Sequence, residues 1–414
     1  RFGNAGQTDY ASANDLLCKL ISHLRSTRPD TRAIAIDWTG WEGIGMASRG
    51  SIPTLLKQAG MELLPPHEGV AVVRHELVSS GFRGEVVIAK GLGGMLAELD
   101  ETGGVDVARL PAGKASPGPM TGKVLGMGIF APLRVETPLD PTQQPFLFDH
   151  RIDETPVLPG VMGLEGMAEA AALLFADRRV AVLEDVRFLA PFKFHRSRER
   201  TVELSARPSI DGEGIAFADC AVIGSRLLHG QTEPEVTTHF TGRVLLRHGQ
   251  GQAEPRERGI PTAEHEPLTA DAIYRVYFHG PAYRVIGSAW RSGEEFVGRL
   301  AEGLPPNHLP ADRPLLVAPR LIELAFQTAG LAEMTTAGRM GLPARIEKLE
   351  LHCAVEEGDA TFHAIASARE DGAYDVDVVD GAGKVCLTLR GYGTAALPGP
   401  VDTDLLEPLR VVSA

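Results

Sequence analysis

The chain has 414 residues, too many for one typical domain, and 43% of them are hydrophobic, enough to build sizeable cores. Lys and Arg number 41 against 54 Asp and Glu, which gives a net charge of −13. This balance, without a basic stripe, argues against a protein that binds nucleic acid or anionic membranes. The sequence shows no apolar run long enough to span a bilayer and no signal peptide, so we expect a cytoplasmic protein.

The four cysteines lie far apart in the sequence, at Cys18, Cys220, Cys353 and Cys386. They form no CxxC pair and no Cys/His spacing of the kind that binds zinc. We therefore expect buried or free thiols in a reducing compartment, and no metal site.

Residues 1–92 have an alternating helix and strand pattern. Helical spacing of apolar residues predicts three helices: Tyr10–Ser26, Ile52–Ala59 and His67–Ser79. Two apolar runs, Arg32–Trp38 and Glu85–Lys90, predict strands, and a Gly-rich loop over Thr39–Gly50 follows the first. This alternation predicts a parallel sheet covered by helices, and two strands are enough only for the C-terminal part of a Rossmann-like domain. Residues 93–122 and 397–414 are rich in Gly, Pro and small side chains, which predicts linkers.

Residues 123–396 contain an internal repeat. In each copy a proline precedes an apolar helix: Pro159 precedes Val161–Ala176, and Pro319 precedes Arg320–Glu333. The similar segments Glu184–Leu189 and Glu347–His352 follow these helices. Alternating patterns then predict four strands: Thr201–Ala206, His239–Leu246, Thr361–Ala368 and Lys384–Tyr392. The repeat predicts two helix-plus-strands units, 123–246 and 268–396, separated by the polar stretch Arg247–Pro267.

The first copy contains a candidate catalytic corner at Phe148–Gly160. It places His150 in a polar turn, and Pro159 and Gly160 lead from that turn into the apolar helix. The first amides of a helix lack partners within the helix and attract developing negative charge. The corner therefore combines a titratable imidazole with a helix N-terminus.

Three short motifs in this region resemble those of the dehydratase domains of polyketide and fatty acid synthases. His150 and Pro159 resemble the HxxxGxxxxP motif, with Glu154 in place of the glycine. Pro319, Glu323 and Gln327 resemble the helix motif Pro-x-x-x-Asp-x-x-x-Gln/His, with Glu323 in place of the aspartate. The third motif, His279-Gly-Pro-Ala-Tyr283, is similar to the family's Tyr-Gly-Pro-x-Phe turn.

The three motifs occur in the family's order over about the whole of residues 123–396. The residues of these motifs are most similar to those of iterative type I synthases of the enediyne and polyunsaturated fatty acid type. The resemblance implies a double hot-dog fold of class α+β and dehydration of a 3-hydroxyacyl thioester without a cofactor. It also implies a substrate carried on the phosphopantetheine of an acyl carrier protein, contacts with neighbouring synthase domains, and homodimerisation.

The chemistry of dehydration assigns roles to these residues. One group must remove an α-proton and another must protonate the departing hydroxide. His150 can be the base because imidazole titrates near neutrality, and Glu323 can be the acid if burial in an apolar tunnel keeps it protonated. Amides at Gly160 and Val161 could hold the thioester carbonyl, and Gln327 could bind the hydroxyl or position the carboxyl. The remaining substrate-contact candidates are Pro159, His279 and Tyr283.

The segment Gly3–Asn14 contains a Tyr-x-x-x-Asn pattern formed by Tyr10 and Asn14. Together with Asp37–Trp41, it resembles ketoreductase domains of type I polyketide synthases. The resemblance implies that Tyr10 donates a proton to a ketone and that NADPH binds only to a complete ketoreductase. The family's glycine-rich fingerprint and catalytic Ser and Lys lie upstream of Tyr10, so we expect this segment to be inactive alone and the chain to be a piece of a longer polypeptide.

Several alternatives stay open at this point. Asp149 and Asp153 are predicted to be turn formers, and His195 and His239 to be surface or strand residues. His279 and Tyr283 could belong to a packed turn with no substrate contact, and Glu323 could be a solvated charge. The alternative functions are a thioester hydrolase on the same fold and a catalytically silent domain that binds acyl chains and dimerises.

Overall fold

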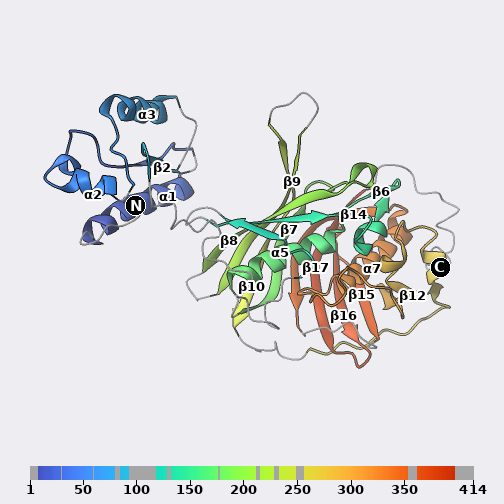
Figure 1. Ribbon diagram of the computed structural model, residues 1–414. Coiled ribbons are helices and arrows are strands. Elements are labelled where there is room, and N and C mark those ends of the chain that lie inside the picture. The colour runs from blue at the N-terminus through green and yellow to red at the C-terminus, as the bar shows by residue number, and fades with distance from the viewer. Residues whose placement is uncertain are drawn as a thin grey trace. The chain divides into compact units, whose positions relative to one another are not determined.

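The computed structural model describes residues 8–28, 30–58, 60–79, 84–92, 118–127, 132–175, 178–210, 215–227, 233–248, 256–352 and 361–396. The predicted linker at 397–414, most of that at 93–122, the motif residues before Thr8, and Cys353 lie outside these ranges. The chain divides into two compact units, Arg1–Asp100 and Glu101–Ala414, shown in Figure 1.

The first unit has the predicted α/β pattern. Strands β1 (Ile34–Trp38) and β2 (Gly84–Ile88) pair in parallel. Three helices accompany them: α1 (Thr8–Thr27), α2 (Ile52–Gln58) and α3 (Pro66–Val78). The ends of these helices and strands lie within two residues of the predicted ends. The resemblance to a ketoreductase stays a prediction.

The second unit is built on two long helices and one long sheet. The first half contains α5 (Gly160–Leu174) and the strands β3 (Lys123–Gly126), β4 (Leu133–Leu139), β7 (Arg178–Phe188), β8 (Arg200–Ile210), β9 (Ala216–Arg226) and β10 (Glu235–His248). The second half contains α7 (Pro319–Ala337) and the strands β11 (Leu268–Thr269), β12 (Ile286–Ser292), β13 (Glu295–Leu300), β14 (Gly341–Leu351), β15 (Phe362–Ala368), β16 (Tyr374–Asp380) and β17 (Val385–Ala396). These described strands form one antiparallel sheet in the order β11-β12-β13-β15-β16-β17-β14-β7-β10-β9-β8-β4-β3.

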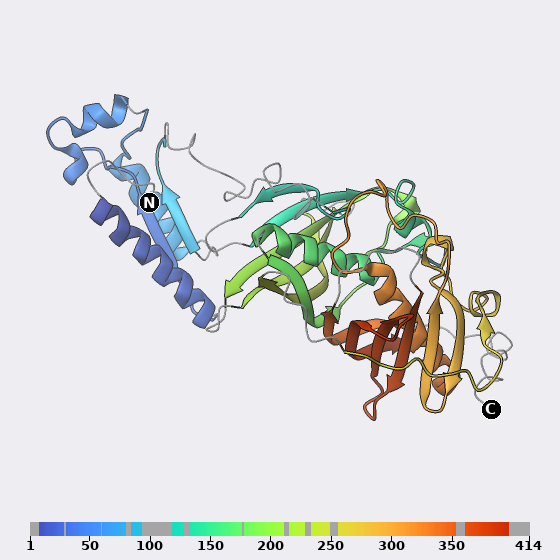
Figure 2. The same cartoon turned by 90° about the horizontal axis from the view of Figure 1, so that it is seen from below.

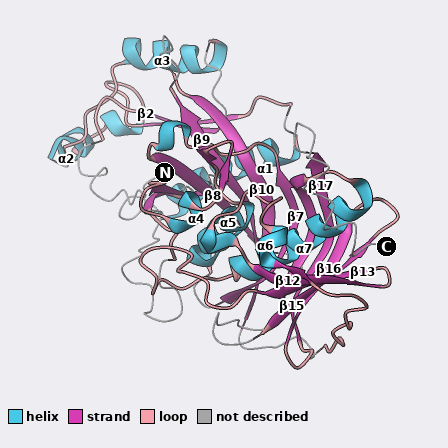
Figure 3. Cartoon of the chain, turned by 90° about the vertical axis from the view of Figure 1, so that its right-hand side faces the viewer, coloured by secondary structure: helices cyan, strands magenta, loops and turns pink. Residues whose placement is uncertain are grey.

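Each long helix is wrapped by the strands of its own half, as Figures 1 and 2 show for the green α5 and the orange α7. Almost every side chain of α5 and α7 is buried, which explains why both helices are apolar nearly all round. Figure 3 shows the magenta strands curving around the cyan helices. The predicted double hot-dog fold is confirmed.

The two halves join where the repeated segments meet. Strand β7 pairs antiparallel with β14, with Leu183 opposite Leu349 and Glu184 opposite Lys348. The two similar segments that mark the repeat in the sequence, Glu184–Leu189 and Glu347–His352, lie on these strands except for their last residues. The pairing makes the strands of the two halves one continuous sheet, and α5 and α7 also contact each other.

The structure differs from the predicted boundaries in two places. Gly118–Thr121, assigned to the linker, are buried, and the Met120 N–H donates to Glu169 of α5. The folded unit therefore begins before residue 123. Residues 256–267, assigned to a polar stretch between the copies, also belong to the second half, because Arg258 pairs with Asp377 of β16.

Candidate active site

His150 lies after the short helix α4 (Pro145–Phe148), at the start of a tight hairpin formed by β5 (Arg151–Ile152) and β6 (Thr155–Pro156). Its Nδ1 lies 2.8 Å from the carbonyl oxygen of Val157. A carbonyl oxygen only accepts, so Nδ1 carries the proton and Nε2 keeps its lone pair. The hairpin fixes the tautomer that a base requires.

The hairpin turn contains Asp153 and Glu154, with φ of 48° and 60°. Both φ values lie in the left-handed region that favours glycine. This conformation gives a physical reason for a glycine at the position that Glu154 occupies. Both side chains are exposed, so the departure from the motif leaves the cavity unchanged.

A turn from the second half lies against His150. The backbones of His150 and His279 form a bridge, and their rings are 5.5 Å apart between centroids. The short 3-10 helix η5 (Pro281–Tyr283) follows His279. Asp149 holds this turn, because its carboxylate accepts the N–H of Ala282 at 2.8 Å and its backbone oxygen accepts that of Gly280 at 2.7 Å. Asp149 thus does more than form a turn: it joins the two halves at the site.

Helix α7 contributes Glu323 and Gln327, one turn apart on the same face. The Gln327 Nε2 donates to Glu323 Oε1 and to the backbone oxygen of Tyr283, both at 2.9 Å. The Gln327 Oε1 accepts the Tyr274 hydroxyl at 2.8 Å. The Gln327 amide therefore has partners at its nitrogen and its oxygen, and one of them is the Glu323 carboxyl. Its role toward a substrate stays a prediction.

The start of α7 is held from the first half. Glu165 of α5 accepts the N–H groups of Leu316 and Val317 at 2.7 and 3.0 Å. Ala318, the next residue, has a left-handed φ of 52° and leads into Pro319. This contact fixes the entry into the helix that carries Glu323.

Glu323 and His279 form a buried pair. His279 Nε2 lies 3.3 Å from Glu323 Oε1, and each residue is 6% exposed. Burial alone raises the pKa of the Glu323 carboxyl, but the hydrogen bond and charge of His279, with smaller effects of His150 and Gln327, outweigh it. The pKa of Glu323 therefore lies below its ordinary value. The expectation that burial keeps Glu323 protonated is wrong, because it omitted the two N–H donors on Oε1.

The pKa of His150 moves in the direction that a base needs. Burial lowers it to about 4, and repulsion by His279 adds to the effect, while Glu323 opposes it. His150 is therefore neutral at pH 7. The environment of His150 therefore keeps its imidazole free of a second proton.

His150, His279, Glu323 and Gln327 line one cavity of about 280 Å³ between the halves. Gly160, at the start of α5, also lines it, whereas Pro159, Val161 and Tyr283 are buried in the surrounding core. The rest of the lining is mainly aromatic and aliphatic, and includes Phe188, Phe240, Phe278, Phe326, Met340, Leu342, Pro343 and Tyr392.

Sequence reasoning missed the aromatic lining and the role of Asp149. Phe326 stacks on Tyr392 with ring centroids 4.5 Å apart, although the two residues come from α7 and β17. Such contacts between distant elements have no local signal. One indication of this lining was present in the sequence: Phe326 directly precedes Gln327 in the helix that carries the motif.

Four other residues of interest are not part of the lining of this cavity. His195 is exposed, and the Nδ1 of His239, on β10, lies 3.1 Å from the Ala190 backbone oxygen. Tyr10 and Asn14 belong to α1 of the first unit, where the Asn14 amide donates to the Tyr10 backbone oxygen at 2.8 Å. Tyr10 is 57% exposed.

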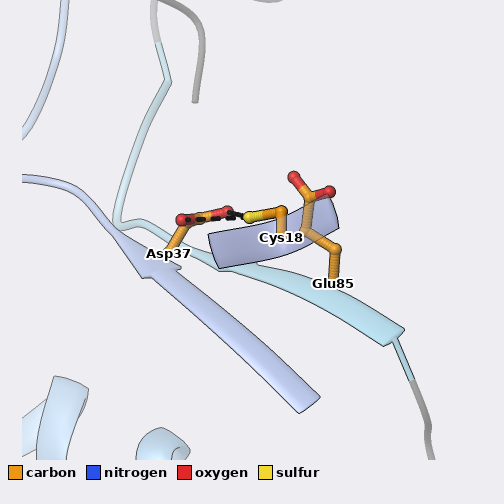
Figure 4. Close-up of side chains that lie close together, drawn as sticks. All are labelled: Cys18, Asp37 and Glu85. Carbon is orange, nitrogen blue, oxygen red and sulfur yellow. Dashed lines mark hydrogen bonds between the residues drawn. The ribbon is translucent and has the colours of Figure 1, made fainter. Parts of the chain in front are cut away.

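The cysteines that the structure describes, Cys18, Cys220 and Cys386, are buried thiols that form no disulfide with one another, as predicted. In the first unit Cys18 of α1 lies between Asp37 of β1 and Glu85 of β2 (Figure 4). The Cys18 thiol donates to Asp37 at 3.4 Å, so this contact satisfies it as a thiol and does not require a metal-bound thiolate. Among the helices in the described ranges, none is both long and apolar enough to cross a membrane.

Two family models match the second unit. Residues 127–218 match a model described as polyketide synthase dehydratase domain, and residues 253–404 match one described as polyketide synthase dehydratase N-terminal domain. The dehydratase domain of the CurF module of curacin polyketide synthase has the same fold, with a TM-score of 0.55 at 20% identity over 68% of this chain and 99% of that structure.

Two longer proteins are similar to the chain. Polyketide synthase ThaG of Burkholderia thailandensis is 32% identical over 270 residues, which is 61% of this chain and 4% of that protein. A polyunsaturated fatty acid synthase of Thraustochytrium is 22% identical over 394 residues, which is 90% of this chain and 12% of that protein. The chain thus spans a small fraction of each of these relatives.

Proposed function

We propose that the polyketide synthase dehydratase domain, which the family models support over residues 127–218 and 253–404, removes water from a 3-hydroxyacyl thioester to give the enoyl thioester. The observation that carries the proposal is the meeting of His150 from the first half and Glu323 from the second half in one largely apolar cavity. This elimination requires a base within reach of the C2 proton and an acid within reach of the C3 hydroxyl of one bound chain.

In the proposed reaction His150 is the base. Its Nδ1 proton is engaged by Val157, so Nε2 takes the proton from C2 of the substrate. The C2–H pair becomes the C2=C3 double bond, and the C3–O bond breaks with its electron pair on oxygen. Glu323 delivers the proton that turns the departing hydroxide into water.

The thioester carbonyl gains negative charge as the α-proton leaves. The N-terminus of α5 at Gly160 lies at the cavity wall, and its positive end favours such charge. A Cβ at Gly160 would stand 2.9 Å from the Phe188 ring, so glycine lets the helix end and this ring pack together. Gln327 contributes by holding the Glu323 carboxyl in place.

The apolar lining of the cavity suits an acyl chain. An extended carrier arm would bring that chain into the cavity. We therefore infer a substrate bound to the phosphopantetheine of an acyl carrier protein, with no cofactor for the dehydration itself. Neighbouring synthase domains and a second copy of the chain are the further partners we infer from the family, together with a cytoplasmic location.

We also infer that the first unit is the C-terminal part of a ketoreductase and that the chain comes from an iterative synthase of the polyunsaturated fatty acid or enediyne type. The similarity to the polyunsaturated fatty acid synthase of Thraustochytrium supports both, because it extends over 90% of the chain. Leu16, Leu17 and Leu20 of α1 are each more than half exposed, as expected for a helix that a larger sheet would cover.

The test is water loss from a 3-hydroxyacyl carrier-protein thioester, followed by mass spectrometry. We expect His150→Ala and Glu323→Gln each to lower kcat by about 10²-fold or more. His195→Ala, an exposed histidine, is the matched control and should retain full activity. Undiminished water loss by His150→Ala would overturn the proposal, and release of the free hydroxy acid would indicate a thioester hydrolase instead.

A further inference from the structure

The cavity contains a third titratable side chain that the two-residue scheme does not use. His279 stands in a turn whose family counterpart has tyrosine, and its Nε2 lies 3.3 Å from Glu323 Oε1. The same Oε1 accepts the Gln327 amide at 2.9 Å. The carboxyl that must donate a proton is thus arranged to be stabilised as a carboxylate.

This arrangement creates a difficulty for an acid that works alone. With a pKa below the ordinary glutamate value, Glu323 by itself would carry a proton in only a small fraction of molecules at neutral pH. His150 cannot supply it, because His150 must be neutral to act as the base. Imidazole, however, is the side chain that ordinarily changes charge between pH 5 and 8.

We propose that His279 holds the proton that Glu323 delivers to the departing hydroxide, so that the acid of this site is the His279–Glu323 pair. The proposal rests on the proposed dehydration and deepens it. His279 acts through Glu323 and is therefore a positioning residue that also holds a proton. It is buried, its ring faces that of His150 across 5.5 Å, and it lines the same cavity as Glu323.

The proton balance of a turnover follows. C2–H breaks with its proton going to His150 Nε2, and C3–O breaks with the Glu323 proton going to the oxygen. Glu323 takes the Nε2 proton of His279, so His150 has gained one proton and His279 has lost one. Transfer of that proton from His150 back to His279, through water after product release, restores the resting site.

The other titratable side chains near the His279–Glu323 pair do not supply a proton to Glu323. Tyr274 and Tyr277 donate their hydroxyl groups to Gln327, and burial raises the pKa of both phenols. Asp149 is engaged by the Ala282 N–H. Arg284 donates to the His279 backbone oxygen at 3.1 Å.

The test is the pH dependence of kcat/KM, measured with the N-acetylcysteamine thioester of a racemic 3-hydroxy acid. His279→Gln keeps an N–H donor near Glu323 but cannot titrate. We expect its activity to approach that of the wild type near pH 4.5 and to fall at pH 7 by on the order of 100-fold. A purely structural role of His279 would instead lower kcat/KM by one factor at every pH, and that result would overturn the proposal.

His363→Gln is the matched control, since His363 is another buried histidine with an unpartnered Nδ1 among the described residues and lies on β15, outside the cavity lining. Its pH profile should match the wild type. If His279→Gln does not fold, the pH profile of the wild type distinguishes the His279–Glu323 pair from Glu323 acting alone. The pair keeps kcat/KM level from about pH 5 to neutrality, whereas Glu323 acting alone gives a tenfold fall per pH unit above its own lowered pKa. No activity at any pH would count against the dehydration itself.

Discussion

The carboxylate of Asp149 accepts the backbone N–H of Ala282 at 2.8 Å, and this bond ties the residue before His150 to the turn that begins at His279. The bond crosses between the two halves of the fold. Its partners are partly buried, so its loss would leave a backbone N–H without its acceptor. Asp149 therefore controls how closely the two histidines approach.

We expect Asp149→Ala to lower kcat by about 10- to 100-fold, because small displacements of reacting groups cost rate. The free energy of unfolding should fall by about 1–3 kcal/mol, since a hydrogen bond to a charged group is lost. Asp149→Asn keeps an acceptor oxygen and is the control that should stay within a few fold of wild type. Equal losses in both variants would show that the charge, and not the bond to Ala282, matters.

Glu154 occupies a turn position with a left-handed φ of 60°. Glycine reaches this conformation without the steric cost that a side chain incurs. We predict that Glu154→Gly raises the free energy of unfolding by up to about 1 kcal/mol and leaves kcat unchanged. Urea unfolding measures the first quantity. A less stable variant would mean that the Glu154 side chain makes a favourable contact in solution.

The pKa of His150 sets the acid side of the activity profile. Because burial lowers this pKa to about 4, the base remains neutral as the pH falls from 7 to 5 and becomes protonated only near pH 4. The acid limb of kcat/KM should therefore lie near pH 4, well below the value of about 6.5 of an exposed histidine. An acid limb near pH 6.5 would be incompatible with this environment.

Glu169 of α5 is buried against Met120 and Thr121, and burial together with Glu165 raises its pKa well above the ordinary value. Because the folded pKa exceeds the unfolded one, its contribution to stability is full below about pH 4.3 and is lost as the pH rises through the folded pKa. Glutamine resembles the protonated form. We predict that Glu169→Gln gains more stability over wild type at pH 8 than at pH 5, as measured by urea unfolding at both values. An equal difference at both pH values would contradict the raised pKa.

The long helices and the identity of the site motifs were accessible from the sequence because their signals are local. A proline before an apolar run predicts α5 and α7 within one to four residues at each end. Strand β9 was not predicted, and its residues Ala216–Arg226 include Ala, Gly and Cys, which give only a weak strand pattern. Strand β16 was also missed; its Asp377 is buried because Arg258 and Arg390 pair with it.

The protonation of the site could not be predicted in the same way. Glu323 and His279 are 44 residues apart, and no spacing rule says that one imidazole meets one carboxyl across a turn. Burial alone gives the wrong direction for the Glu323 pKa. The sign depends on which donors reach Oε1, and that is a property of the folded chain.

The two halves differ at the helix positions that carry the candidate site. Counted from the proline at the start of each helix, Gly163 stands in α5 where Glu323 stands in α7, and Met167 stands where Gln327 does. A Cβ at Gly163 would lie 2.3 Å from the Phe240 ring, so an aromatic side chain fills the space that an acid would need. A duplicated unit with identical halves would hold two equivalent reaction chambers. The proposed reaction uses one chamber in the second unit, to which the first half contributes His150 and the second half contributes Glu323.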